Sequence, residues 1–212
     1  MIVYGASVSP FVRKVLAFGM EKSVPLELKQ MGLGSRDPEF IETSPFGKIP
    51  GFRDGDFTIS DSSAIIAYID TLHPEPNLIP TEAKARARTI WYDEFADTIM
   101  VGAMGKIFFN RIVSPKFLGK PGDEAVAMHA EQKEVPPILD YIENVLPASG
   151  HFVEDRLTLA DIAVASPFVN MRHVGIAPNA DRYPKISAFI AKMHARSSFS
   201  TWIEKETRFL AR

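Results

Sequence analysis

Three hydroxyl side chains precede one predicted helix near the start of the chain. Tyr4, Ser7 and Ser9 lie in the stretch YGASVSPF, and Pro10 follows directly after Ser9. A serine before a proline suits the start of a helix, because serine is a favoured N-cap residue and proline needs no N–H at the first helical position. A hydroxyl placed there can instead take part in chemistry on a bound molecule. The residues alone leave both roles open.

A second group of candidate residues flanks a predicted hairpin at 49–60. Asp61 and Ser62 follow it and start a helix, whose N-terminus attracts carboxylates through free N–H groups and the helix dipole. Lys48 and the pair Ile49–Pro50 lie at its beginning. The plainer interpretation is two capping residues, a solvated lysine and an edge-strand proline.

The chain contains no cysteine, which excludes disulfides, thiolate metal ligands and a cysteine nucleophile of its own. Any thiol chemistry would therefore use the sulfur of a ligand. The five histidines lack the close spacing of a HExxH-type motif, so we expect no metal site.

The first 72 residues combine strands, recognised by β-branched or alternating residues, with helices of three- and four-residue apolar spacing. The order β-α-β and then β-β-α predicts a mixed sheet of four strands with helices packed on it. The predicted elements are a strand at 1–7, a helix from Pro10 to about Glu21, a strand at 26–31, a hairpin at 49–60 that turns at Asp54–Gly55, and a helix capped by Ser60 or Asp61.

The proline-rich stretch at 73–83 is interpreted as a linker, and beyond it the sequence predicts helices only. Thr158 and Asp161 form a capping box, which specifies a helix start and serves folding. The predicted helical segments are a long one ending at a break at 114–124, one at 125–146 that Pro136–Pro137 must kink or split, and three at about 158–171, 184–196 and 199–208.

The composition is typical of a globular protein, with 46% hydrophobic and 24% charged residues among 212. The net charge of −2 does not favour nucleic acid or an anionic membrane as a partner. The apolar runs are too short to span a bilayer, and the N-terminus does not have the pattern of a signal peptide. We therefore expect a cytoplasmic protein.

Three segments together resemble the glutathione transferase family. SPFGKIPGFRDGDFTISDSSAIIAYI at 44–69 resembles its glutathione-binding stretch, and FVEDRLTLADIAVA resembles its second-domain capping-box segment. SVSPFVRKVLAF resembles the first turn and helix of the members that use serine. The resemblance implies a thioredoxin-like α/β domain at 1–76 that binds glutathione, followed by an all-α domain at 84–212 that carries the electrophile pocket.

The resemblance also implies roles for the hydroxyl groups. Ser9 aligns with the serine that donates a hydrogen bond to the glutathione sulfur, and it ranks before Tyr4 and Ser7 for that role. The expected reaction is attack of the glutathione thiolate on a hydrophobic electrophile. Peroxide reduction, ether cleavage, isomerisation and a non-catalytic scaffold or ligand carrier are the alternatives.

The implied glutathione contacts come from both sides of the hairpin. Ile49, before a cis Pro50, would pair with the backbone of the ligand, while Asp61 would face its ammonium and Ser62 its γ-glutamyl carboxylate. Asp61 departs from the family pattern, which more often has glutamate. The remaining implied contacts are Lys48 for the glycine carboxylate, Arg36 as a second cation, and Phe11 at the start of the first helix.

The electrophile is expected between the two domains. Met100, Met104, Phe108 and Arg111 follow helical spacing, and polarizable or aromatic side chains suit an apolar co-substrate, with Phe11 facing the same cleft. An ordinary core stripe is the commoner explanation of such spacing. By resemblance we expect a homodimer.

Overall fold

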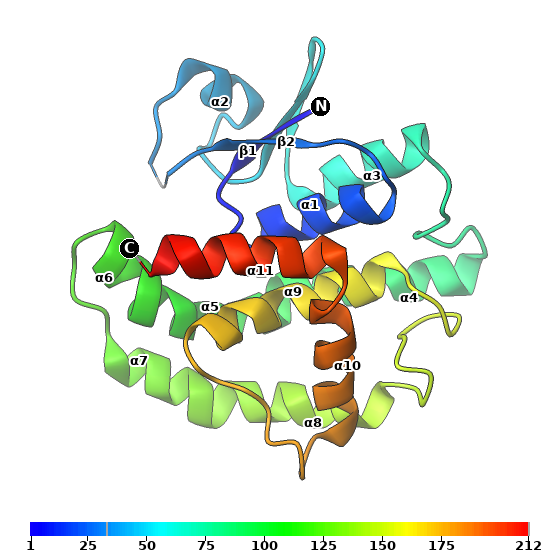
Figure 1. The fold of residues 1–212 in the computed structure, drawn as a ribbon, viewed down its shortest axis with the longest axis vertical. Coiled ribbons are helices and arrows are strands. Elements are labelled where there is room, and N and C mark those ends of the chain that lie inside the picture. Colours follow the sequence, from blue (N-terminus) through cyan, green and yellow to red (C-terminus); the bar gives the residue numbers. More distant parts are fainter. Residues whose placement is uncertain (33, 212) are drawn as a thin grey trace. The chain divides into compact units, whose positions relative to one another are not determined.

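The computed structural model describes residues 1–32 and 34–211, and the chain forms two compact units (Figure 1). Unit 1 comprises Met1–Leu78 and Ser197–Arg212, and unit 2 comprises Ile79–Arg196. The last helix, α11 (Ser197–Leu210), belongs to unit 1 because it packs along α1 (Pro10–Glu21). The sequence had grouped that helix with the second domain, and the expected domain boundaries stay a prediction.

Unit 1 contains the predicted mixed sheet, with strand order β2-β1-β3-β4. The parallel pair β1/β2 is flanked by the antiparallel pairs β1/β3 and β3/β4, which confirms the topology expected from the element order. The strands are β1 (Ile2–Gly5), β2 (Glu27–Gln30), β3 (Gly51–Asp54) and β4 (Phe57–Ser60).

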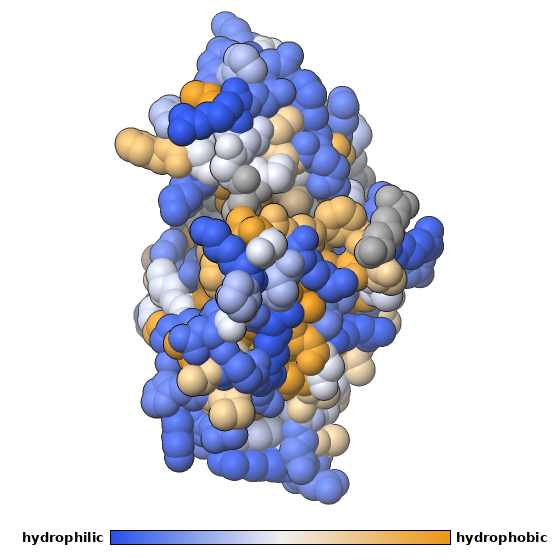
Figure 2. Space-filling view, turned by 90° about the vertical axis from the view of Figure 1, so that its left-hand side faces the viewer, coloured by the Kyte–Doolittle hydropathy of each residue, from blue (hydrophilic) through white to orange (hydrophobic). Residues whose placement is uncertain are grey.

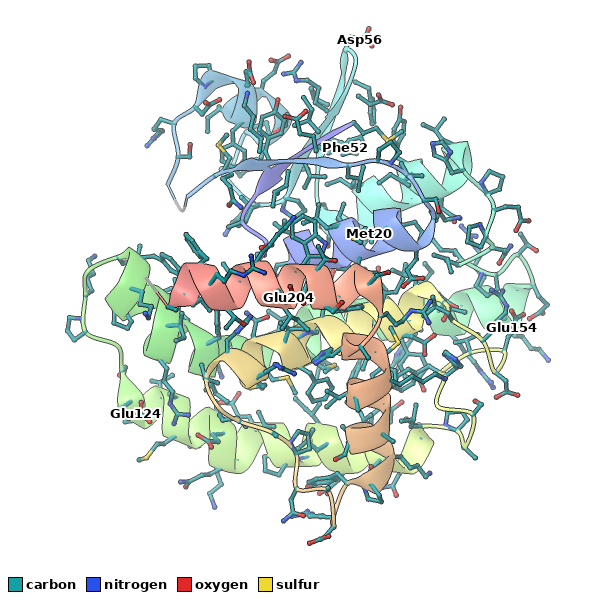
Figure 3. The ribbon with its side chains drawn as sticks, viewed as in Figure 1. Met20, Phe52, Asp56, Glu124, Glu154 and Glu204 are labelled. Atoms are coloured by element: carbon teal, nitrogen blue, oxygen red, sulfur yellow. The ribbon has the colours of Figure 1, made fainter. Side chains whose placement is uncertain are left out.

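Helices cover both faces of this sheet. Tyr4 on β1 is buried against Phe40 of α2 (Pro38–Thr43). Phe52 on β3 packs edge-to-face on Tyr68 of α3 (Ser62–Leu72), with 5.7 Å between the ring centroids (Figure 3). Phe52 lies opposite Val3, and consecutive residues of a strand face opposite sides, so α2 and α3 lie on opposite faces.

The hairpin turn differs by one residue from the prediction. Asp54 pairs with Phe57, so Gly55 and Asp56 form the two-residue loop, whereas the sequence placed it at Asp54–Gly55 (Figure 3). Gly55 has a φ of +59°, which a residue without Cβ adopts without strain. The predicted hairpin is confirmed, and its register puts glycine at the first loop position.

Lys22, just after α1, anchors the segment that leaves unit 1. Its buried ammonium donates to the carbonyl oxygens of His73 at 2.6 Å and Pro76 at 2.9 Å, and it pairs with Asp70 at 2.6 Å. The proline-rich stretch interpreted as a linker is therefore held to the first unit over its initial residues.

Unit 2 contains helices and one isolated β-bridge among its described residues. The first long helical segment continues through α6, so the break begins at Leu118 rather than at Ser114 as predicted. A π-helical stretch directly precedes two proline-containing helix starts, at Pro115 and at Pro136, but not the start of α10 at Pro184. The helical elements are α4 (Ala83–Glu94), η1 (Phe95–Met100), α5 (Val101–Phe108), η2 (Phe109–Val113), α6 (Ser114–Phe117), α7 (Glu124–His129), η3 (Ala130–Glu134), α8 (Val135–Val145), α9 (Leu159–His173) and α10 (Pro184–His194).

No helix in the described part of the chain is both long and apolar enough to cross a membrane.

The predicted capping box at the start of α9 is present. The buried carboxylate of Asp161 accepts the Thr158 N–H at 2.8 Å and the Phe152 N–H at 3.0 Å. The Thr158 hydroxyl also donates to it at 3.2 Å. Asp161 therefore fixes the loop before α9 as well as the helix start.

Replacing Asp161 with alanine should lower the free energy of unfolding by about 1–3 kcal/mol, because buried N–H donors lose their acceptor. Asp161→Asn keeps one acceptor oxygen and should lose less. Urea unfolding of the three proteins measures the difference, and equal stability of Asp161→Ala and the parent would contradict the assignment.

Candidate active site

Three segments that carry the candidate residues meet at one edge of the sheet. Tyr4 near the end of β1 lies opposite Gly51 at the start of β3, and Gly51 lies opposite Ser60 at the end of β4. The loop after β1, the turn before β3 and the start of α3 are consequently neighbours. A Cβ added at Gly5 would lie 3.3 Å from the Ile49 Cβ, which confirms how closely the first two segments approach.

Ser9 occupies the N-cap position of α1, with Pro10 directly after it, as the sequence predicted. Its N–H donates to the Ala6 carbonyl and its own carbonyl accepts the Arg13 N–H, both at 2.9 Å. Its side chain makes no capping hydrogen bond and is half-buried. The backbone of Ser9 is thus held on both sides, while its hydroxyl is not used to cap the helix.

Among the described residues, the Tyr4 hydroxyl, unlike that of Ser9, donates a hydrogen bond to a carboxylate. Tyr4 is fully buried, and its hydroxyl donates to the Glu39 carboxylate of α2 at 3.3 Å. Lys29 donates a hydrogen bond to Glu39 and forms an ion pair with it, and this contact is the main cause that lowers the pKa of Glu39. The acceptor of the Tyr4 hydroxyl therefore stays ionised at neutral pH. Tyr4 therefore combines a core ring with a hydroxyl engaged by a carboxylate.

Ser7 is buried and lines a small cavity of about 80 Å³ within unit 1. Gln30 of β2 and Trp202 and Lys205 of α11 also line it. A cavity of this volume is well below the size of an ordinary small-molecule site.

The turn before β3 has the geometry that the resemblance implied. The Ile49–Pro50 peptide bond is cis. Ser44, directly before a proline, accepts the Lys48 N–H at 2.9 Å and donates to the Lys48 carbonyl at 2.6 Å. Sequence reasoning did not single out Ser44, which holds the backbone next to Ile49. A Cβ at Gly51 would lie 2.1 Å from the Thr43 hydroxyl oxygen, so only glycine fits where the turn meets α2.

The main chain of Ile49 is available for a ligand. Within residues 1–32 and 34–211, neither its N–H nor its carbonyl forms a hydrogen bond with another backbone group or side chain. Unpaired main-chain groups of such a segment can pair with the backbone of an extended ligand as with an added strand. The Lys48 side chain is exposed beside them.

Asp61 is the N-cap of α3 and adopts a strained backbone conformation. One carboxylate oxygen, Oδ1, accepts the N–H groups of Ser63 and Ala64, both at 3.0 Å. Its φ of +84° lies in a region that residues other than glycine rarely adopt. This backbone conformation is unfavourable by about 1–3 kcal/mol. Such strain persists where the surroundings over-determine it, often at functional sites. The next residue, Ser62, is buried at the first helical position.

Two basic side chains of α1 lie behind this edge and were not predicted from the sequence. Arg13 and Lys14 are buried, and the Lys14 ammonium donates to the Ser63 hydroxyl at 3.2 Å. Arg13 pairs with Glu206 of α11. The spacing gave no signal of this burial, because on a helix with about 100° per residue Arg13 and Lys14 lie opposite the apolar stripe of Val12 and Val15.

The other candidates of unit 1 lie closer to solvent. Arg36 is exposed in the loop before α2, and Phe11 is half-buried in the first turn of α1.

The predicted co-substrate stripe lies in unit 2. Met100, Met104 and Phe108 are at most 6% exposed, which fits the alternative that they form an ordinary core stripe. Arg111 pairs with Glu124 at 2.6 Å and with Glu131 at 2.7 Å, and these carboxylates raise its pKa. A role of these four residues toward a co-substrate stays a prediction.

In the described part of the chain, no group of three or more His, Asp or Glu side chains could hold a metal ion.

Both parts of the chain match known protein domains. Residues 3–77 match the family model of the glutathione S-transferase N-terminal domain, and residues 108–206 match that of the C-terminal domain. A glutathione S-transferase of Hyoscyamus muticus is 29% identical over 209 residues, covering 96% of this chain and 98% of the relative. Glutathione S-transferase 4 of Zea mays is 30% identical over 204 residues, covering 94% and 84%. The crystal structure of glutathione transferase F7 from Populus trichocarpa superposes with a TM-score of 0.82 at 25% identity, covering 96% and 97%.

Proposed function

This chain belongs to the glutathione transferase family, and from that premise we propose that Ser9 stabilises glutathione as its thiolate for attack on hydrophobic electrophiles. The observation that carries the proposal is the edge of the sheet where the Ser9 loop, the cis-proline turn and the start of α3 meet. There the Ser9 hydroxyl is not used for capping, whereas the Tyr4 hydroxyl is engaged by Glu39.

Glutathione would bind along this edge through its backbone and its charged ends. The free N–H and carbonyl of Ile49 would pair with the cysteinyl unit as an added strand does. Ser62, at the positive end of α3, would hold the γ-glutamyl carboxylate. Asp61 uses Oδ1 for the helix cap, which leaves Oδ2 for the ligand's ammonium. Lys48, and more distantly Arg36, would attract the glycine carboxylate.

The energies involved are sufficient to ionise the thiol. A free thiol has a pKa near 8.5, so only about 3% is thiolate at pH 7. A hydrogen bond from Ser9 to a charged sulfur contributes about 1.5–3 kcal/mol, and the α1 N-terminus adds up to about 1 kcal/mol. Since one pKa unit corresponds to about 1.4 kcal/mol, the thiolate becomes the main species near neutral pH. Ser9 keeps its proton and acts as a donor.

The proposed substitution or addition needs no oxidant or reductant. The thiolate sulfur uses its electron pair to form a bond to an electrophilic carbon. In substitution the leaving group departs with the electrons of its bond, and in addition to an activated double bond water supplies the proton. Peroxide reduction, aryl-ether cleavage and isomerisation would use the same thiolate, so the substrate decides between them.

Binding to immobilised glutathione and turnover with a chlorinated aromatic, an organic hydroperoxide and an aryl ether test the proposal together. We expect retention on the column and turnover of the chlorinated aromatic. Binding with turnover of the hydroperoxide or ether alone would favour the corresponding alternative. Absence of binding and of turnover would indicate a non-catalytic scaffold or carrier.

Replacing Asp61 with asparagine should raise the KM for glutathione about tenfold, because the ammonium loses a charged partner worth about 1–2 kcal/mol. Asparagine keeps a carbonyl oxygen for the α3 cap, so thermal stability should change little. Steady-state kinetics with glutathione as the varied substrate checks this, and Asp54→Asn on the hairpin is the matched control. An unchanged KM would remove Asp61 from the ligand contacts.

We also propose a cytoplasmic homodimer. The dimer is supported by Phe46, a large hydrophobic side chain that is 90% exposed in the loop between α2 and β3. Hydrophobic residues also reach the surface on the face shown in Figure 2. Static light scattering should give twice the chain mass, and Phe46→Ser should increase the monomer fraction. A parent protein that is monomeric at micromolar concentration would contradict the dimer.

A further inference from the structure

A buried ion pair joins the helix that follows Ser9 to the last helix of the chain. Arg13 is 0% and Glu206 is 1% exposed, although they lie 193 residues apart. The Arg13 guanidinium donates through Nε to Oε1 of Glu206 at 3.0 Å and through Nη2 to Oε2 at 2.8 Å. This two-bond geometry fixes the orientation of the guanidinium plane.

Stability alone is a weak reason for such a pair. Removing two charges from water is unfavourable, and well-packed apolar residues often replace a buried pair with no loss of stability. What apolar side chains cannot replace is a directed hydrogen bond from the guanidinium to a third group.

That third group lies in the loop that carries Ser9. Nη2 of Arg13 is 3.4 Å from the Val8 carbonyl oxygen, within reach of a hydrogen bond. The Arg13 N–H also binds the Ser9 carbonyl at 2.9 Å. The Val8 carbonyl belongs to the Val8–Ser9 peptide unit and the Ser9 carbonyl to the next one, so Arg13 contacts the two successive peptide units that flank the Ser9 Cα. Glu206 fixes the direction of the Arg13 side chain.

We infer that Glu206 and Arg13 are positioning residues that hold the Val8–Ser9 peptide so that the Ser9 hydroxyl faces the glutathione sulfur. The inference rests on the proposed function of Ser9. It gives the C-terminal helix a role in activating the thiol, although α11 supplies none of the groups assigned to bind glutathione.

The double variant Arg13→Met/Glu206→Leu separates positioning from stability. It replaces both charges with apolar side chains of similar length, so its melting temperature and its dissociation constant for glutathione should stay close to the parent values. Its kcat should fall about tenfold, and the thiol of bound glutathione should titrate about one pKa unit higher, followed by ultraviolet absorbance of the thiolate. A merely structural pair would move neither kcat nor this titration.

Two further variants complete the experiment. Glu206→Gln keeps the side-chain shape and one acceptor oxygen, so it should fold and lose only part of the turnover. Arg208→Gln/Glu204→Gln removes the exposed pair of α11, whose side chains are 74% and 66% exposed, and should match the parent in every measurement (Figure 3).

The outcomes distinguish this inference from the proposed function. If the double variant has the kcat and the thiol titration of the parent, the inference is overturned. The proposed function is still upheld in that case if the parent protein shows a thiolate signal with bound glutathione. A parent without a thiolate signal on binding glutathione would overturn both.

Discussion

Replacing Ser9 with alanine is expected to lower kcat by about 10- to 150-fold while leaving the KM for glutathione nearly unchanged. The range corresponds to the loss of one hydrogen bond to a charged sulfur, worth about 1.5–3 kcal/mol. Glutathione affinity depends mainly on groups away from the sulfur, namely Ile49, Asp61 and Ser62. Steady-state kinetics measures both parameters.

The pH dependence gives an independent measurement of the same effect. Ser9 favours the thiolate over the thiol, so its removal raises the thiol pKa by about 1–2 units. The rise of kcat with pH should therefore shift to higher pH in Ser9→Ala by the same amount. A lower rate with an unshifted profile would mean that Ser9 acts otherwise than as a donor to sulfur.

Tyr4→Phe is the comparison that decides between the two hydroxyls. It keeps the buried ring in the core with Met31 and Phe40 and removes only the group that donates to Glu39. We expect turnover within about twofold of the parent, because Ser9 is retained. Loss of turnover in Tyr4→Phe with normal turnover in Ser9→Ala would reverse the assignment.

The second large effect is on stability: Glu206→Ala should lower the free energy of unfolding by about 3–5 kcal/mol. The substitution leaves the buried Arg13 guanidinium without its carboxylate, and an uncompensated buried charge is far more unfavourable than a lost surface pair. Urea unfolding of the parent and the variant measures the difference.

A matched control lies on the same helix. Glu204 pairs with Arg208 at 3.2 Å on the exposed side of α11, and Glu204→Ala should change stability by less than about 1 kcal/mol. Equal losses in Glu204→Ala and Glu206→Ala would show that only the helix propensity of α11 matters. Recovery of stability on adding Arg13→Met to Glu206→Leu would confirm that the unpaired charge is the cause.

Local sequence signals accounted for much of unit 1. Ser9–Pro10 and the apolar spacing after it predicted α1 from Pro10 to Glu21, and the structure has these bounds. The strands, the hairpin and the cap of α3 also followed from short patterns, because caps and turns depend on residues within a few positions of one another. The turn was misplaced by one residue, since its register depends on the cross-strand pairing as well as on Asp-Gly.

The sequence by itself determined the family, the mixed sheet, the helical second half and the set of candidate groups around Ser9, Ile49 and Asp61. Only the tertiary structure decided which of these groups have other partners. It directed the Tyr4 hydroxyl to Glu39, enclosed Met100 and Met104, and joined Arg13 to Glu206 on a helix that the sequence had assigned to the other domain. The physical reason is distance along the chain: the choice of partner for a buried polar group depends on packing between elements up to 193 residues apart, which no local spacing encodes.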